Sequence, residues 1–155
     1  VHPEVNNMKV LISVDIHRGG RALVEAAVKW LAARTDVETI DLVYVFELAP
    51  AGGAGPGEPY IWHELMPQWE SLYAKARSEL DALLERVPEE RRGNALAPLG
   101  TANSAVAEMT HRYDLVMVGT QQHKGLSRFW LGSHAERLVR SSAAPVMVLP
   151  LSGAE

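Results

Sequence analysis

Four consecutive apolar residues, Leu115 to Val118, lead directly into a glycine and then into a long loop before a helix start. Such a run is typical of a strand that is covered on both faces, and Gly119 ends it where the backbone must turn. Ser133 and Glu136 have the spacing of a capping box at the start of the next helix. Because helix N-terminal amides and the helix dipole bind phosphate, this order predicts an anion pocket.

The loop between that strand and that helix is cationic, although the chain as a whole carries a formal net charge of −4. No acidic residue occurs between Asp114 and Glu136. The same stretch contains His123, Lys124, Arg128 and His134. The local field therefore favours an anion, which agrees with the predicted pocket.

Segments with strand-like and helix-like spacing alternate along the chain. We expect strands at 9–15, 39–46, 94–99, 115–118 and 145–149, and helices at 22–34, 65–87, 102–112 and 133–141. Pro67 suits the first turn of the second helix, and Pro88 lies just beyond its end. This alternation predicts an α/β protein with a parallel sheet, right-handed crossovers and helices on both faces. Ligands bind such sheets at the carboxyl ends of the strands, where the strand order reverses.

Composition limits the classes of protein that remain. The chain has 155 residues, of which 47% are hydrophobic, so we expect a single domain at residues 8–151 after an N-terminal extension at residues 1–7. The acidic balance argues against nucleic acid and membrane surfaces as partners. There is no cysteine and no apolar run of about 18 residues, so we expect a cytoplasmic protein without a membrane span.

The stretch from Tyr113 to Glu136 resembles the signature of the universal stress protein family. That signature reads Gly, two residues, Gly, nine residues, Gly, then Ser or Thr, and Gly119, Gly132 and Ser133 match it at this spacing. Residues 125–128 also resemble the usual loop, whereas Gln122 stands where the second signature glycine falls. The resemblance covers nearly the whole chain. It implies an open five-stranded parallel sheet of order 3-2-1-4-5, the adenine nucleotide alpha hydrolase-like fold.

The resemblance also implies a site for an adenine nucleotide, ATP, at the carboxyl ends of strands one and four. Asp15 and the main chain of Val45 would contact adenine, Gly119 would let the ribose approach, and the loop with Gly132 and Ser133 would hold phosphates. The implied binding residues are Asp15, Val45, Val118, Gly119, Gln122, Gly125, Gly132 and Ser133. Three of them have a purely structural alternative: Asp15 starts a turn or caps a helix, Val45 is a core residue, and Ser133 is an N-cap.

Gln122 decides between two interpretations. Its side chain either crowds the phosphates or turns outward and donates its amide to them, so we expect weakened ATP binding rather than none. If no nucleotide binds, the resemblance implies a dimeric stress protein that acts through protein partners. A slow ATP-hydrolysing or nucleotidyl-transferring enzyme is a third hypothesis. The sequence offers no obvious general base for such an enzyme, because Asp15 and Glu47 are the only carboxylates expected near the pocket. We therefore assign no catalytic residue.

Three further expectations concern metals, assembly and a loop. The six histidines share no metal-ligand spacing, so we expect no metal site. The strand from Pro145 to Leu149 would lie uncharged at a sheet edge, which predicts a homodimer paired through it. The glycine- and proline-rich segment from Ala49 to Pro59 leaves the carboxyl end of the second strand, and we expect it to act as a lid over the pocket.

Overall fold

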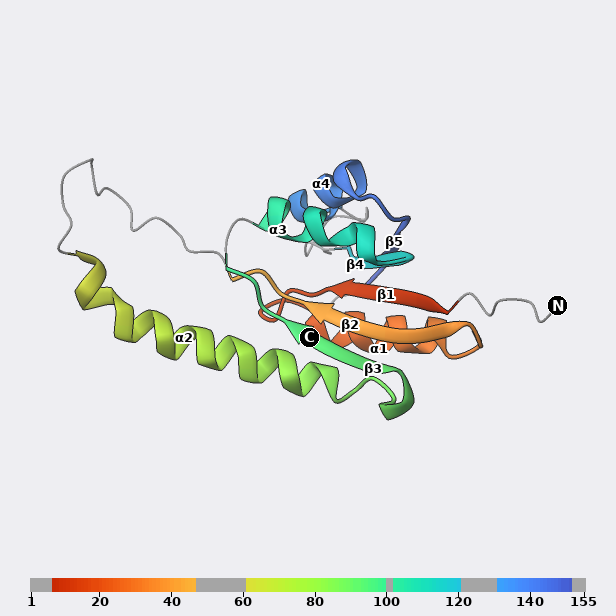
Figure 1. The fold of residues 1–155 in the computed structure, drawn as a ribbon, viewed down its shortest axis with the longest axis horizontal. Coiled ribbons are helices and arrows are strands. Elements are labelled where there is room, and N and C mark those ends of the chain that lie inside the picture. Colours follow the sequence, from red (N-terminus) through yellow and green to blue (C-terminus); the bar gives the residue numbers. More distant parts are fainter. Residues whose placement is uncertain (1–6, 47–60, 100–101, 121–130, 152–155) are drawn as a thin grey trace.

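The structure is a computed structural model that describes residues 7–46, 61–99, 102–120 and 131–151, without the side chains of 61–66 and 102–103. Within these ranges the strands form one parallel sheet of order β3-β2-β1-β4-β5, as predicted (Figure 1). They are β1 (Met8–Ser13), β2 (Val37–Val43), β3 (Arg92–Leu96), β4 (Leu115–Gly119) and β5 (Val146–Leu149). The strand order therefore reverses between β1 and β4.

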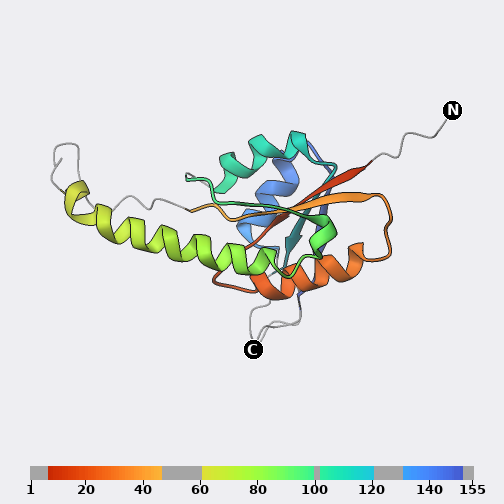
Figure 2. The ribbon, with the colours of Figure 1, turned by 60° about the horizontal axis from the view of Figure 1, so that its bottom comes forward.

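Helices cover both faces of the sheet (Figures 1 and 2). They are α1 (Gly20–Leu31), α2 (Ile61–Leu84), α3 (Ala102–Met109) and α4 (Ser133–Ser141), with short 3₁₀ helices η1 (Glu89–Arg91) and η2 (Thr110–Arg112). The pair α1 and α2 lies on one face and the pair α3 and α4 on the other, while the amino-terminal part of α2 extends past the sheet (Figure 1). In the described part of the chain, no helix is long and apolar enough to cross a membrane.

The core consists of two apolar clusters, one on each face of the sheet. Successive residues of β1 alternate between them: Val10 and Ile12 pack toward α1 and α2, and Leu11 packs toward α3 and α4. All three side chains are fully buried. A central strand that is apolar on both faces can occupy only the middle of a layered α/β domain, which explains why β1 lies at the centre of the sheet.

The long helix begins earlier than predicted. It starts at Ile61, so Pro67 lies inside α2 rather than in its first turn. Proline has no amide hydrogen, and the carbonyl of residue 63 therefore loses its usual partner at position 67. The Pro67 side chain is exposed, so its ring does not disturb the core.

The predicted capping box is also wrong. Gly132, with φ −59° and ψ 156°, is the N-cap of α4, and no side chain caps this helix end. Ser133 is already helical, and the amide of Glu136 donates to the carbonyl oxygen of Gly132 at 2.9 Å. The Glu136 carboxylate binds Arg140 at 2.9 Å instead of reaching back to the helix start. The first amides of α4 therefore donate to no capping side chain.

The central strands are shorter than predicted at their carboxyl ends. β1 ends at Ser13, two residues before Asp15, and β2 ends at Val43. The chain after β2 stays attached to the segment after β3, because the amide of Tyr44 donates to the Leu96 carbonyl at 2.9 Å and that of Phe46 to the Pro98 carbonyl at 3.0 Å. Val45 is thus held at the end of the sheet although it lies outside the strand.

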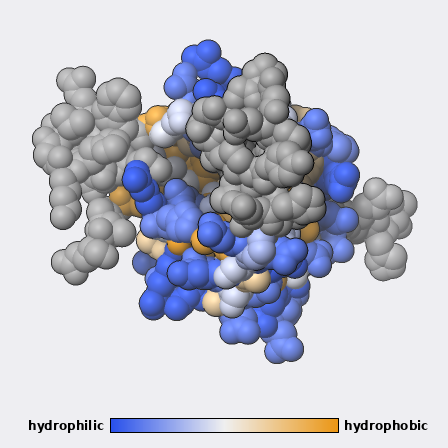
Figure 3. Space-filling view, turned by 90° about the vertical axis from the view of Figure 1, so that its left-hand side faces the viewer, coloured by the Kyte–Doolittle hydropathy of each residue, from blue (hydrophilic) through white to orange (hydrophobic). Residues whose placement is uncertain are grey.

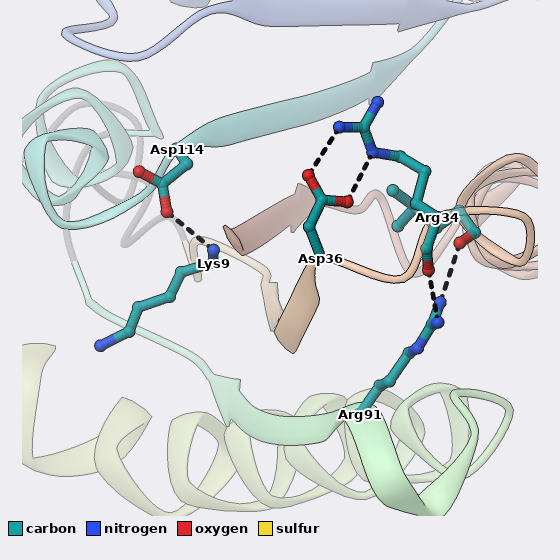
Figure 4. Close-up of polar contacts among 6 residues, drawn as sticks. Lys9, Arg34, Asp36, Arg91 and Asp114 are labelled. Atoms are coloured by element: carbon teal, nitrogen blue, oxygen red, sulfur yellow. Dashed lines mark hydrogen bonds and ion pairs between the residues drawn. The ribbon is translucent and has the colours of Figure 1, made fainter. Parts of the chain in front are cut away.

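Polar contacts close the opposite, amino-terminal end of the sheet (Figure 4). The guanidinium of Arg91 donates to the carbonyl oxygens of Leu31 at 2.8 Å and of Arg34 at 2.6 Å, and so closes the end of α1. Arg34 in turn donates two hydrogen bonds to Asp36, which lower the pKa of that carboxyl. The Lys9 amide donates to the Asp114 carboxylate at 2.8 Å. These contacts order the turns between elements at the end that carries no predicted ligand residue.

Asp41 on β2 is the centre of a second polar network. Its carboxylate accepts hydrogen bonds from the Tyr113 hydroxyl at 2.6 Å and from the Asn94 amide at 2.7 Å. Desolvation and the hydrogen bond to Asp41 raise the pKa of Tyr113 above its ordinary range. This network joins the start of β4 to β3, the strand with the least strand-like composition.

The raised pKa of Tyr113 predicts a loss of stability at high pH. The folded state holds the hydroxyl protonated, so its stabilising effect is complete below the unfolded pKa of about 10 and is lost as the pH rises through the folded pKa. We expect the free energy of unfolding to fall more between pH 8 and pH 11 for the native sequence than for Tyr113→Phe. Urea denaturation at both pH values measures this difference. Equal losses in the two proteins would contradict it.

Candidate functional site

A cavity of about 390 Å³ opens at the carboxyl ends of β1, β2 and β4, beside the amino end of α4. Figure 3 views the molecule from the side to which these strand ends point, and the described surface there combines apolar patches with a larger hydrophilic area. The structure brings together these predicted residues around the cavity: Asp15, Val45, Val118, Gly119, Gly132 and Ser133. Gln122, Gly125 and the predicted lid at 49–59 lie outside the described residues.

Asp15 occupies the turn between β1 and α1. Its Oδ1 accepts the amide hydrogen of His17 at 2.9 Å, so the turn interpretation of this residue is confirmed. Gly19 follows with φ 71°, a backbone conformation that glycine adopts without strain, and it forms the N-cap of α1. A carboxylate oriented in this way keeps Oδ2 as an acceptor for a donor that enters the cavity.

The far wall of the cavity is formed by the segment after β2. Val45 is buried, and its neighbours Tyr44 and Phe46 also line the cavity. Phe46 packs edge to face against Trp69 and Tyr73 of α2, with ring centroids 5.6 Å apart in both pairs. These aromatic contacts anchor Phe46 against α2, and they thereby hold the main chain of the adjacent Val45 at the cavity.

Gly119 ends β4 directly beneath Leu151. A Cβ atom at position 119 would lie 2.6 Å from Leu151 Cδ1, so the absence of a side chain is required by packing within the chain. The segment after β5 is held there because the Leu151 amide donates to Thr120 Oγ1 at 3.0 Å. The predicted role of Gly119 toward a ribose stays a prediction, and the structure adds a second reason for glycine.

The amino end of α4 also lines the cavity. Gly132 and Ser133 line it, and Ser133 is exposed. The uncapped amides of this end and the positive pole of the helix dipole favour an anion. The predicted contact of Gly132 and Ser133 with phosphates stays a prediction.

Four more polar side chains line the cavity, of which sequence reasoning placed His17 and Arg18 at the pocket rim and counted His134 among the loop cations, but missed Ser13. Ser13 and His134 join β1 to α4 through a 2.8 Å contact between Ser13 Oγ and His134 Nε2. His17 and Arg18 lie in the turn after β1, and the His17 ring meets Tyr44 edge to face at 6.0 Å. For Ser13 the only signal in the sequence was its position two residues before Asp15.

The described residues around the cavity include one carboxylate, one guanidinium and two imidazoles. This set can accept and donate hydrogen bonds to a polar ligand, but it holds no second carboxylate to pair with Asp15 as acid and base. In the described ranges, no three His, Cys, Asp or Glu side chains gather as a metal site would require.

An open parallel sheet with a cavity at its point of reversal defines an α/β protein of the class in which ligands bind at the strand ends. The family comparison makes this class specific. The chain belongs to the Universal stress protein family, whose model matches residues 6–150. No curated protein matches the chain.

Solved structures show the same fold. The chain is 17% identical to the universal stress protein UspA from Lactobacillus plantarum, with a TM-score of 0.65 over 93% of this chain and 98% of that chain. It is 15% identical to the hypothetical protein MJ0577, with a TM-score of 0.69 over 96% and 99%. A universal stress protein solved in complex with cAMP is 16% identical, with a TM-score of 0.55 over 95% and 99%. At these identities the likeness establishes the fold, including the predicted adenine nucleotide alpha hydrolase-like arrangement of the sheet.

Proposed function

We propose that this protein binds an adenine nucleotide, ATP, in the cavity at the carboxyl ends of β1 and β4. One observation carries the proposal. The residues that the family resemblance implies as ligand contacts come from four separate segments of the chain, and those in the described ranges line the same cavity. Its volume of about 390 Å³ falls in the range of small-molecule sites, which is about 300–1,000 Å³. The cavity also offers different chemistry at its two ends.

The two ends suit the two ends of a nucleotide. The wall at Val45 and Phe46 is apolar and lies near the Asp15 carboxylate, which suits a flat base that carries an amino group. Another part of the lining is the uncapped end of α4 with Gly132 and Ser133, which suits phosphate. The cAMP complex of a relative supports an adenine nucleotide as the ligand class in this family.

Substitution at Asp15 is expected to weaken ATP binding by about tenfold or more, because a hydrogen bond to a charged group is lost. Asp15→Asn keeps an oxygen for the His17 amide and tests the carboxylate alone, whereas Asp15→Ala also removes the turn contact. Calorimetry of both variants with ATP measures the loss. Glu90→Gln is the matched control, because Glu90 is exposed at η1 and distant in the fold from the strand carboxyl ends.

A second substitution addresses the signature position that departs from glycine. Gln122→Gly is expected to tighten ATP by about tenfold or less, because a site that demands positive φ would cost a non-glycine residue about 1 kcal/mol of strain. Release of nucleotide from the purified, denatured protein provides an independent observation. If neither the native protein nor Gln122→Gly binds ATP at millimolar concentration, the nucleotide proposal fails.

We also propose a homodimer that pairs through β5. This strand lies at the edge of the sheet, and its four residues, Val146 to Leu149, are uncharged and partly exposed. Val139 on the neighbouring α4 is an exposed large apolar residue on the same side of the fold. If no nucleotide binds, a dimer that contacts protein partners becomes the better account of the function.

A further inference from the structure

Ser13 and His134 form a polar pair in the wall of the cavity. Ser13 is the last residue of β1 and only 7% exposed, and its Oγ lies 2.8 Å from His134 Nε2. Thr110 is also buried, but its hydroxyl donates to the Ala107 carbonyl at 2.7 Å and accepts the Ala143 amide at 3.0 Å. Of these two buried hydroxyls, the one on Ser13 therefore faces the ligand cavity.

The pair lies between the two ends of the proposed nucleotide site. Ser13 precedes Asp15 by two residues at the end of β1, and His134 follows Ser133 on α4. A nucleotide with its base near Asp15 and its phosphates near Ser133 would pass its sugar and first phosphate across this pair. The geometry points to Ser13 and His134 as a phosphate-recognition pair in which His134 takes up a proton when a nucleotide phosphate binds. This inference rests on the proposed function.

The direction of the hydrogen bond explains how the pair would respond to a proton. When the ring is neutral with its hydrogen on Nδ1, Nε2 accepts the Ser13 hydroxyl hydrogen, and the hydroxyl presents only acceptor lone pairs to the cavity. When the ring is protonated, Nε2–H donates to Ser13 Oγ, and the hydroxyl hydrogen turns to the cavity. The proton comes from solvent and no covalent bond in the ligand changes. A phosphate oxygen requires donors, so it favours the protonated arrangement.

The electrostatic surroundings make this protonation depend on an anion. His134 is the second residue of α4, where the positive end of the helix dipole opposes a second positive charge. A bound phosphate makes a positive charge on His134 favourable, because the phosphate attracts both the helix end and the imidazolium. Proton uptake should therefore accompany binding of a phosphorylated ligand and not binding of adenosine.

Other charged groups near His134 are few in the described residues. The cavity lining also includes Asp15, His17, Arg18 and Tyr44. β4 and β5 carry no titratable side chain, and Glu108 of α3 is exposed. On α4 itself, the exposed charged residues are Glu136, which pairs with Arg140, and Arg137.

The test is calorimetry of ATP binding at pH 7 in two buffers with different ionisation enthalpies. The native protein should take up protons on binding, and His134→Gln should take up fewer, because glutamine can still contact Ser13 but does not titrate. Between pH 8 and pH 6, the native protein should gain about tenfold more ATP affinity than His134→Gln. One proton taken up changes the affinity about tenfold per pH unit, so this gain corresponds to an average uptake of about half a proton over the two units. The phosphates of ATP also titrate, but their contribution is common to both proteins.

A control assigns the effect to the pair. His111→Gln, at an exposed position on η2 outside the cavity lining, should keep the full proton uptake. Adenosine should bind without proton uptake. Ser13→Ala should lower ATP affinity by about threefold to tenfold and leave adenosine affinity unchanged, which tests the hydroxyl even if His134→Gln folds poorly.

Several results would overturn the inference. One is equal proton uptake by the native protein and His134→Gln with ATP bound to both. Another is native ATP affinity in Ser13→Ala. Either result leaves the proposed nucleotide function intact. Absence of ATP binding by the native protein at every pH would remove both the inference and the proposed function.

Discussion

Replacement of Val148 by proline is expected to convert a dimer into a monomer without unfolding the chain. Within the sheet, the Val116 amide donates to the Pro145 carbonyl and the Thr120 amide to the Leu149 carbonyl, each at 2.9 Å. Successive residues of a strand direct their backbone groups to opposite sides. Positions 145, 147 and 149 therefore bond to β4, and the amide of Val148 points to the open edge.

That geometry makes the substitution selective. Proline at position 148 removes a donor that a second copy would use, and it places a ring at the edge, while the hydrogen bonds between β4 and β5 stay in place. Light scattering measures the mass, and circular dichroism checks that the fold persists. Val148→Thr is the matched control, because it keeps the amide and the branched shape and should remain dimeric. A mass that is the same for Val148→Pro and the native protein would refute pairing through β5.

Substitution of Gly93 by alanine is expected to lower the free energy of unfolding by about 2 kcal/mol. A Cβ atom at this position on β3 would overlap Asp41 Oδ1 and approach the Ile40 carbonyl oxygen to 3.1 Å. The carboxylate cannot move away freely, because the Tyr113 hydroxyl and the Asn94 amide hold it. The alanine side chain therefore either strains β3 or separates Asp41 from its donors.

Urea denaturation measures this loss of unfolding free energy, with the same m value, the slope against urea concentration, used for every variant. Asn94→Ala is the matched control. Asn94 is the exposed neighbour on the same strand and binds Asp41 through its backbone amide, which alanine keeps. The free energy of unfolding of this variant should therefore stay within about 0.5 kcal/mol of the native value. In the background Tyr113→Phe, the effect of Gly93→Ala should shrink, because one of the two donors that fix the carboxylate is gone. A Gly93→Ala protein as stable as the native one would contradict the account of this network.

Much of the fold was predictable because its signals are local. Strands such as the run Leu115 to Val118 are apolar on both faces, and the alternation of strands with helices permits few arrangements. The segment Arg92–Leu96 is different, since its letters RGNAL have no strand-like pattern. β3 is stabilised by pairing with β2 and by the contact of its Asn94 amide with Asp41, neither of which can be read from the segment itself.

The errors and omissions have the same physical origin. The spacing of Ser133 and Glu136 fits a capping box, but Gly132 takes the cap position and Arg140 binds the glutamate. Ser13 and His134 are 121 positions apart in the sequence, so neither residue indicates the other until the sheet and α4 bring them together. Local spacing predicts elements, whereas the contacts that define the cavity wall depend on how those elements pack.

Leu151 gives the cavity a boundary that lies outside the signature stretch. It follows the last strand, is fixed by Thr120, and fills the space above Gly119 that a side chain would otherwise occupy. The segment after β5 therefore sets the depth of the cavity beside β4. A smaller or larger residue at this one position would alter the size of ligand that the cavity admits while every signature glycine stayed in place.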